Sequence, residues 1–242
     1  MDKILSFQMS LFGNFINIEP NQEITGKLIN NLSGEGFIPG TAAISTVDPV
    51  NKKIETETRL QLVSQDAMWK IVFFQERIDV TYEYHMGNIF YENFDSIFKR
   101  TTNILTKTFI TFPDTVGNRL AINVKFLLPI MNKDNEKLFI KKYVKPLSLF
   151  ENSDIDEWDI HYNVLDNIDF AEEKHELCNN IIEIRKLYMS DMQVRSRIGV
   201  GFDINTVADN TKNRFKYNDL VLFSDVVKDK FEKLLVLILE EV

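Results

Sequence analysis

The feature that most constrains the fold is an amphipathic stretch at the end of the chain, Phe215–Val242. Apolar residues recur in it every three or four positions, as on the buried stripe of a helix. A similar stretch, Phe90–Phe112, lies near the middle of the chain and also begins with a pair of aromatic residues. The sequence therefore predicts two long helices, each of which ends one half of the chain. The stripe of the later helix consists of Leu220, Phe223, Val227, Phe231, Leu234 and Ile238.

The residues before the first long helix alternate between apolar and polar, which is typical of strands with one buried face. After the helix predicted first, Gly34 or Gly36 provides a residue that can adopt a positive φ. Pro39 and Gly40 interrupt the next apolar segment, so we expect an irregular edge strand there. Short polar turns separate the last three segments, which predicts an antiparallel meander. In order, the predicted elements are a strand at 5–11, a helix at 22–32, the edge strand at 37–47, and strands at 58–64, 68–75 and 78–84.

A junction rich in turn residues, Asp114–Asn118, precedes a second series of elements in the same order. This series predicts a strand at 120–128, a short helix at 136–144, strands near 158–164, 182–188 and 198–204, and the closing helix from Tyr217. The predicted fold class is α+β, with two tandem strand-helix-strands-long helix units at 1–116 and 117–242. The antiparallel sheets are covered by helices on one face. We expect them to join edge to edge into one compact unit, because that would remove two exposed edges.

Composition limits the classes of function. The chain has 242 residues, a hydrophobic share of 44% and a net charge of -8, which indicates a folded protein and opposes non-specific binding to nucleic acid. The single cysteine excludes an intrachain disulfide. The N-terminal residues lack the sustained apolar region of a signal peptide, and the run Leu234–Leu239 is too short to span a bilayer. These features predict a cytoplasmic bacterial protein without a membrane segment.

Motifs that carry chemistry are absent from the sequence. It contains no phosphate-binding glycine loop, no zinc-binding H-E-x-x-H and no C-x-x-C. His161 alternates with Asp159 and Asn163 on one strand face, which we interpret as an ordinary exposed face, while His175 is expected in a loop. Cys178 is expected to be a small buried apolar residue. We therefore predict no catalytic, cofactor-binding or metal-binding residue, and the sequence favours a protein without enzymatic activity.

Two surfaces are candidates for contacts with other molecules. The end of the closing helix is apolar on every side, so it is buried either within the fold or against a partner chain, and the sequence leaves both open. The candidate partner interface consists of Leu235, Leu237 and Leu239. Basic residues close together in sequence, across a predicted hairpin, suggest an anion-binding patch made of Arg185, Lys186, Arg195 and Arg197.

Three parts of the sequence carry a resemblance to a known family. They are the segment Arg59–Tyr84 (RLQLVSQDAMWKIVFFQERIDVTYEY), the aromatic residues Tyr91 and Phe94, and the strand Ile198–Thr206 (IGVGFDINT). They resemble a sporadically distributed family of bacterial proteins of about 250 residues with no established activity. The scattered occurrence of that family implies an accessory system such as defence against phages. The resemblance implies no catalytic residues.

The sequence thus favours a non-catalytic binding or scaffold subunit of a bacterial accessory system that acts through a protein partner or as a homo-oligomer. Two alternatives remain open. One is a sensor or enzyme that binds a small anionic ligand, such as a nucleotide, between the halves. The other is a nucleic-acid-binding protein that uses the exposed sheet face, which would require that face to be locally basic.

Overall fold

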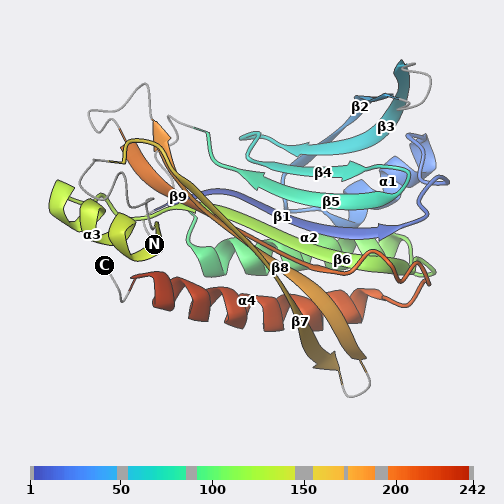
Figure 1. The fold of residues 1–242 in the computed structure, drawn as a ribbon. Coiled ribbons are helices and arrows are strands. Elements are labelled where there is room, and N and C mark those ends of the chain that lie inside the picture. Colours follow the sequence, from blue (N-terminus) through green and yellow to red (C-terminus); the bar gives the residue numbers. More distant parts are fainter. Residues whose placement is uncertain are drawn as a thin grey trace.

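The structure is a computed structural model that describes residues 3–47, 54–85, 92–144, 155–171, 174–188 and 196–239. These residues form four helices and nine strands, so the protein is of the mixed α+β class, as predicted (Figure 1). The described strands make one antiparallel sheet in the order β2-β3-β4-β5-β1-β6-β9-β8-β7. They are β1 (Lys3–Gly13), β2 (Phe37–Val47), β3 (Ile54–Ser64), β4 (Trp69–Phe73), β5 (Arg77–Glu83), β6 (Gly117–Leu127), β7 (Asp159–Ala171), β8 (Lys174–Tyr188) and β9 (Ser196–Thr206).

The centre of the sheet is the antiparallel pair of β1 and β6. Phe7 on β1 lies opposite Tyr82 of β5 on one side and opposite Val124 of β6 on the other. This pair joins the strands that precede residue 117 to the strands that follow it, so they share one continuous sheet.

The four helices are α1 (Gln22–Asn31), α2 (Phe94–Thr111), α3 (Lys133–Tyr143) and α4 (Tyr217–Leu239). Helices α2 and α4 pack on one face of the sheet, α1 packs on α2, and α3 lies at one end of the sheet (Figure 1). The first three helices begin at Asn21, Asn93 and Asn132, whose side-chain oxygens accept backbone N–H groups of the first turn. Such caps satisfy donors that have no partner within the helix, which is why these helices begin where they do.

The core lies where α2 and α4 pack on the sheet. Phe231 of α4 stacks on Phe202 of β9 with ring centroids 5.3 Å apart, and the rings of Phe94 and Phe98 of α2 approach Phe231 at 6.4 Å. Alternate residues of the central strands point into this layer and are almost wholly buried, for example Met9. One cluster of side chains therefore connects both long helices with the sheet.

Gly117 holds the start of β6 in place. Its N–H donates to the carbonyl oxygen of Phe215 at 2.8 Å, and its own carbonyl accepts from the N–H groups of Arg214 and Phe215. A Cβ atom at this position would lie 2.6 Å from the backbone oxygen of Phe12, so a larger residue would force the backbone to move. Glycine therefore allows β6 to lie close to β1 and to the segment that leads into α4.

The structure corrects two strand predictions. The segment 37–47 was expected to be irregular, but β2 pairs with β3 through Pro39 and Gly40 without a shift in register; its position at the edge of the sheet tolerates the proline. The hairpin of β7 and β8 is much longer than predicted, so His175 lies in β8 and not in a loop. Residues 161–167 of β7 are exposed on both faces, and after Val164 the sequence loses the apolar alternation on which the prediction relied.

Two local predictions about the helices have clear outcomes. Gly34 and Gly36, after α1, both have positive φ values of 90° and 73°, as expected for residues that end a helix. The first long helix was expected to run from Tyr91 to about Phe109, but it begins three residues later, at Phe94, because Asn93 caps it. Tyr91 itself lies outside the described residues.

Candidate functional site

The candidate site is the face of the sheet opposite the helices, here called the open face. Helices α2 and α4 pack against each other and against strands of the sheet, and α1 packs on α2, so these helices lie on one side (Figure 1). Alternate residues of each strand point to the other side. Their chemistry decides what the open face could bind.

The middle of the open face is polar. Gln8 on β1 lies opposite Thr81 of β5 and Asn123 of β6, and Asn123 in turn lies opposite Asp203 of β9. Ser6 and Ser10 flank Gln8 on the same face of β1. Because these side chains are short or uncharged, this part of the surface offers hydrogen bonds without a strong net charge.

A ladder of amide side chains crosses four neighbouring strands on this face. Asn163 of β7 donates to Asn179 of β8 at 3.3 Å, and Asn179 donates to Asn205 of β9 at 3.2 Å. Arg119 of β6 also donates to the side-chain oxygen of Asn205, at 3.1 Å. The ladder therefore extends from the centre of the sheet to its β7 edge.

Asp79 on β5 is a buried carboxylate of the open face, with only 3% of its surface exposed. Burial raises its pKa, and this effect outweighs the hydrogen bond from the Ser10 hydroxyl at 2.7 Å and the charge of Arg77, whose Nε lies 3.0 Å away. The Arg77 guanidinium also lies over the ring of Phe74 at 4.5 Å. The group is therefore enclosed by its neighbours and does not present a free charge to a ligand.

Apolar side chains gather on the two wings of the open face, on either side of the polar centre. They are partly or fully exposed, and strand register assigns them to this face. On the β2–β4 wing they are Ile38, Ile44, Val63, Val72 and Phe74, and on the β7–β8 wing they are Leu165, Leu177, Ile181 and Leu187.

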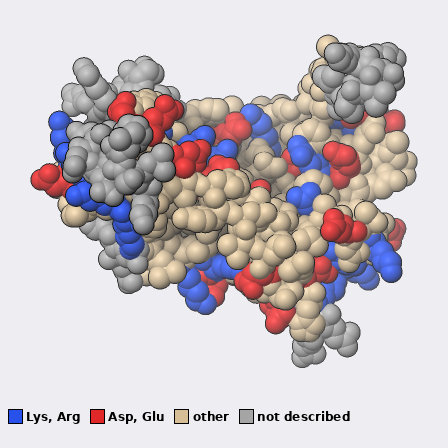
Figure 2. All heavy atoms as spheres, viewed as in Figure 1, with Lys and Arg blue, Asp and Glu red and all other residues tan. Residues whose placement is uncertain are grey.

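Charges of both signs are mixed on the open face. Figure 2 shows Lys and Arg interspersed with Asp and Glu, with broad uncharged areas between them. Lys70 pairs with Glu83 at 3.2 Å, and Arg77 pairs with Asp79. Among the charged side chains that register places on this face, the basic ones include Arg59, Lys70, Arg77, Arg119, Lys125 and Arg185, and the acidic ones include Glu57, Asp79, Glu83, Asp159, Asp169, Glu183 and Asp203. No area of one sign dominates these described residues.

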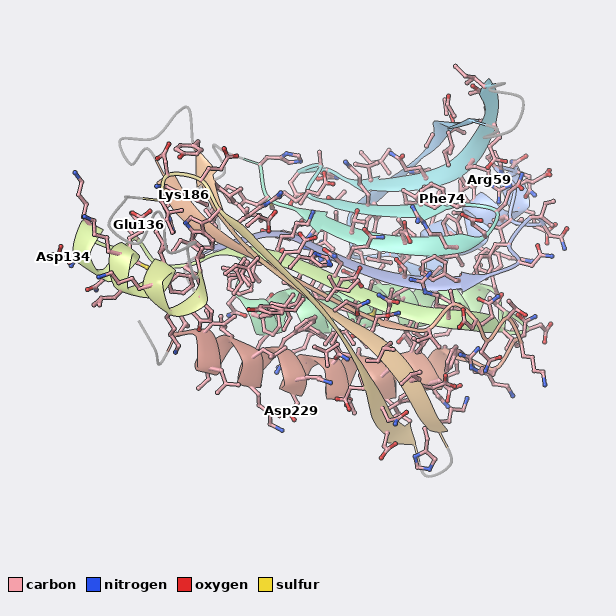
Figure 3. All side chains as sticks on the ribbon, viewed as in Figure 1. Arg59, Phe74, Asp134, Glu136, Lys186 and Asp229 are labelled. Carbon is pink, nitrogen blue, oxygen red and sulfur yellow. The ribbon has the colours of Figure 1, made fainter. Side chains whose placement is uncertain are left out.

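The structure does not bring the predicted anion-binding residues together. Arg185 is exposed on the open face, but Lys186 points to the helix side, where it pairs with Glu136 of α3 at 3.2 Å (Figure 3). Successive residues of a strand point to opposite faces, so two adjacent residues such as Arg185 and Lys186 place their side chains on different sides of the sheet. Arg197 is buried and donates to the carbonyl oxygen of Leu128, and Arg195 lies outside the described residues.

Arg185 instead borders a small cavity beside two glycines of β9. Lys125, Glu183, Gly199 and Gly201 also line this cavity, whose volume is about 40 Å³. That volume admits about one water molecule and no nucleotide.

The last turns of α4 divide between core and surface. Leu235 and Leu239 are partly buried against the protein's own core, and Ile238 is 6% exposed. Leu237 is 57% exposed and Val236 is 47% exposed. Of the three leucines predicted to meet a partner, Leu237 is thus the one that the protein leaves on its surface.

The described residues contain no group of three or more His, Cys, Asp or Glu side chains that could hold a metal ion. Cys178 is buried, and desolvation raises the pKa of its thiol to about 12, so it does not provide a nucleophilic thiolate at neutral pH. His161 lies 3.5 Å from Glu183 and His175 lies 2.6 Å from Asp169, in both cases as an exposed surface pair. Among the described helices, none has the length and apolar character needed to cross a bilayer.

Comparisons with protein-family models, with curated proteins and with solved structures give no match to this chain.

Sequence reasoning missed the amide ladder and the apolar wings. The asparagines at 163, 179 and 205 each occupy a strand position on the open face, but only strand register aligns them. The wings contain Val, Ile and Leu at positions that periodicity assigns to the polar face. A predicted strand order would have been needed to find either feature.

Proposed function

We propose that the protein is a non-catalytic binding subunit that recognises a protein partner with the open face of its sheet. The observation that carries this proposal is the distribution of side chains on that face, a hydrogen-bonding centre between two partly exposed apolar wings. The buried core of a protein interface is more apolar than the rest of the surface, while polar and charged groups select the partner.

The size of the open face supports this proposal. The nine described strands, at a spacing of about 4.8 Å, span about 40 Å, and seven residues such as those of β5 extend about 23 Å. The resulting area of about 900 Å² is similar to the roughly 800 Å² that each partner contributes to a protein interface of standard size.

The mixed charges favour a protein partner over nucleic acid. A face that follows a phosphate backbone needs an excess of Lys and Arg, whose binding releases counterions. On the open face the basic groups have acidic neighbours, as in the Lys70–Glu83 and Arg77–Asp79 pairs. Phosphates would therefore meet repulsion as well as attraction.

A small anionic ligand between the halves has less support. The strands that join the halves, β1 and β6, are directly paired, and α2 packs on α4. The cavity beside β6 and β9 has about 40 Å³, whereas sites for small molecules usually have about 300–1,000 Å³. A wider hollow of about 650 Å³ lies at residues 113–116, but its one basic lining residue, Lys27, pairs with Glu23 at 2.6 Å.

The strand order supports a tandem arrangement of units 1–116 and 117–242 as part of this proposal. In the first unit, the first strand β1 lies next to the last strand β5; in the second unit, the first strand β6 lies next to the last strand β9. The remaining strands follow outward in reverse chain order, and a long helix comes last. We place the protein in a bacterial accessory system, with defence against phages as the expected setting, because of the resemblance carried by Arg59–Tyr84 and Ile198–Thr206.

The experiment that tests this function is co-expression with the products of neighbouring genes, followed by purification on a tag carried by this chain. Ile38→Glu and Ile181→Glu place a charge on each apolar wing, and Leu222→Glu is the matched control on an exposed position of α4. We expect the double wing variant to lose the co-purified partner while the control retains it, with unchanged circular dichroism for both. The proposal is wrong if the wing variant keeps its partner, or if the purified chain alone turns over nucleotides or nucleic acid.

A further inference from the structure

The outer edge of β7 presents a row of backbone groups that no described strand pairs with. β7 is the last strand of the sheet. The N–H of Lys186 donates to the carbonyl oxygen of Trp158 at 3.3 Å, so this pair belongs to the hydrogen-bonded set of the β7–β8 ladder. Hydrogen-bonded pairs recur at every second residue of an antiparallel ladder. Even-numbered residues of β7 therefore bond to β8, and odd-numbered ones direct N–H and C=O outward; these are His161, Asn163, Leu165 and Asn167.

The hydrogen bonds between β8 and β9 agree with this assignment. The N–H of Val207 donates to the carbonyl oxygen of Leu177 at 3.0 Å, so odd-numbered residues of β8 bond towards β9. Even-numbered residues of β8 then bond towards β7, which agrees with the pair formed by Lys186.

The β7 edge lacks the features that usually prevent strand pairing. Its sequence, Asp159–Ala171, contains no proline, glycine or lysine, whereas the opposite edge strand β2 contains Pro39 and Gly40. Three apolar side chains of β7 are exposed, with 48% for Tyr162, 53% for Val164 and 59% for Leu165. Long exposed edges with apolar side chains are templates for another strand.

We infer that β7 pairs antiparallel with β7 of a second copy of this chain, about a twofold axis at Asn163. Tyr162 and Val164 flank Asn163, so the axis places Tyr162 opposite Val164 of the second copy on the helix side, and the reverse. In the same way His161 lies opposite Leu165 of the second copy on the open face. Each exposed apolar side chain of the edge thereby meets a large side chain, as an isologous interface requires.

The amide ladder selects this register. Asn163 donates to Asn179 at 3.3 Å on its own sheet, and at the axis it lies opposite Asn163 of the second copy. The ladder then runs through both sheets. An axis at Val164 would instead place two carboxylates of β7, Asp159 and Asp169, opposite each other. An axis at Tyr162 would move Asn163 away from its counterpart and break the continuity of the ladder.

Charge does not oppose the pairing at Asn163. Asp166 lies 2.7 Å from the ammonium group of Lys230, so its charge is balanced within its own chain. In this register Asp166 lies opposite Ile160 of the second copy, and Asp159 lies opposite Asn167. Within β7 no two carboxylates then face each other, and the closest like charge to Asp169 is Glu157 of the second copy, which precedes that strand.

The oligomeric state of the purified chain tests the interface. Sedimentation of the wild type should show a dimer that dissociates on dilution. Leu165→Lys adds a charge at the free edge and should raise the dissociation constant by about tenfold or more. The matched control is Leu177→Lys, which makes the same change on the same face in an interior strand and should leave the dimer unchanged. The inference would be overturned if the wild type stayed monomeric at about 100 μM, because a specific interface should associate below that concentration. Equal effects of the two variants on the dissociation constant would also overturn it.

Cysteine cross-linking tests the register independently and leaves the rest of the edge unaltered. Opposed Cα atoms lie about 5.5 Å apart in a hydrogen-bonded pair, such as Asn163 with itself, and about 4.5 Å apart in a non-hydrogen-bonded pair, such as Tyr162 with Val164; both distances are within the range of a disulfide. Mild oxidation should therefore link Asn163→Cys to itself, and should link Tyr162→Cys to Val164→Cys only when the two variants are mixed. Cys178 is fully buried and does not interfere. Preferred self-linking at 162 or 164, or linking at none of these positions, would contradict the axis at Asn163.

Discussion

Replacing Phe231 by alanine should remove a large part of the stability of this protein. The side chain is 2% exposed and lies among the rings of Phe94, Phe98 and Phe202, at the only point described here where both long helices and the sheet meet through aromatic rings. Deleting a buried phenylalanine side chain costs about 3–5 kcal/mol, because apolar burial is lost and a cavity remains. We expect about 4 kcal/mol, against a total stability of about 5–15 kcal/mol for a typical domain.

The matched change on the same helix is Leu237→Ala. Full burial of a leucine side chain contributes about 1.5–3 kcal/mol, and the side chain of Leu237 is 57% exposed, so its truncation should cost about 1 kcal/mol or less. Urea denaturation followed by circular dichroism gives both values, provided that the dependence on urea concentration stays the same. A cost below about 1 kcal/mol for Phe231→Ala, or equal costs for the two variants, would refute the assignment of Phe231 to the core and Leu237 to the surface.

Three further predictions concern cooperativity, backbone packing and pH. Each unit of the chain contains one tryptophan, Trp69 or Trp158, so replacing one of them by phenylalanine leaves the fluorescence of the other unit alone. We expect the two variants to give the same urea midpoint. Different midpoints would mean that the units unfold independently. Gly117→Ala should lower the free energy of unfolding by about 1–3 kcal/mol, because the new Cβ atom would lie 2.6 Å from the backbone oxygen of Phe12. In Gly201→Ala the nearest atom to the new Cβ would be 3.6 Å away, so the same denaturation assay should show a change of less than about 0.5 kcal/mol. The raised pKa of Asp79 means that the folded state holds this proton more tightly than the unfolded state, so the contribution of Asp79 to stability is lost as the pH rises from about 4 through its folded pKa. The free energy of unfolding of Asp79→Asn relative to wild type should therefore increase from pH 4 to pH 7, and a constant or falling difference would contradict this.

Periodicity predicted the buried elements because burial on one face leaves a mark in the sequence. The stripe of α4 and the alternation in β1 and β6 each arise from a single buried face, and these elements lie close to where they were expected. β7 gave a weaker signal. Residues 161–167 are exposed on both faces, and the apolar alternation stops at Val164, where Leu165, Asp166 and Asn167 follow, so the prediction ended the strand too early.

The candidate site was harder to predict because it depends on which strands are neighbours. Arg185 and Lys186 are adjacent in sequence, yet strand alternation sends them to opposite faces. Asn163 and Asn205 are far apart in sequence, yet both belong to one hydrogen-bonded ladder. Sequence spacing describes contacts within a helix or strand, but the order of strands in a sheet is a long-range property.

The two proposed surfaces meet at β7, and their combination has a consequence for stoichiometry. Leu165 belongs to the β7–β8 wing of the open face and also lies beside the proposed twofold axis at Asn163. In the dimer the β7–β8 wings of both copies adjoin and form one apolar area at the centre of a shared sheet, while the β2–β4 wings lie at its far ends. A partner that binds the central area then contacts both copies, so it should bind as one per dimer or as a symmetric pair. Leu165→Lys should therefore weaken both self-association and partner binding, whereas Ile38→Glu, on the outer wing, should leave self-association unchanged. Partner binding that stays equally strong after the dimer is broken would separate the two surfaces and assign recognition to the outer wing alone.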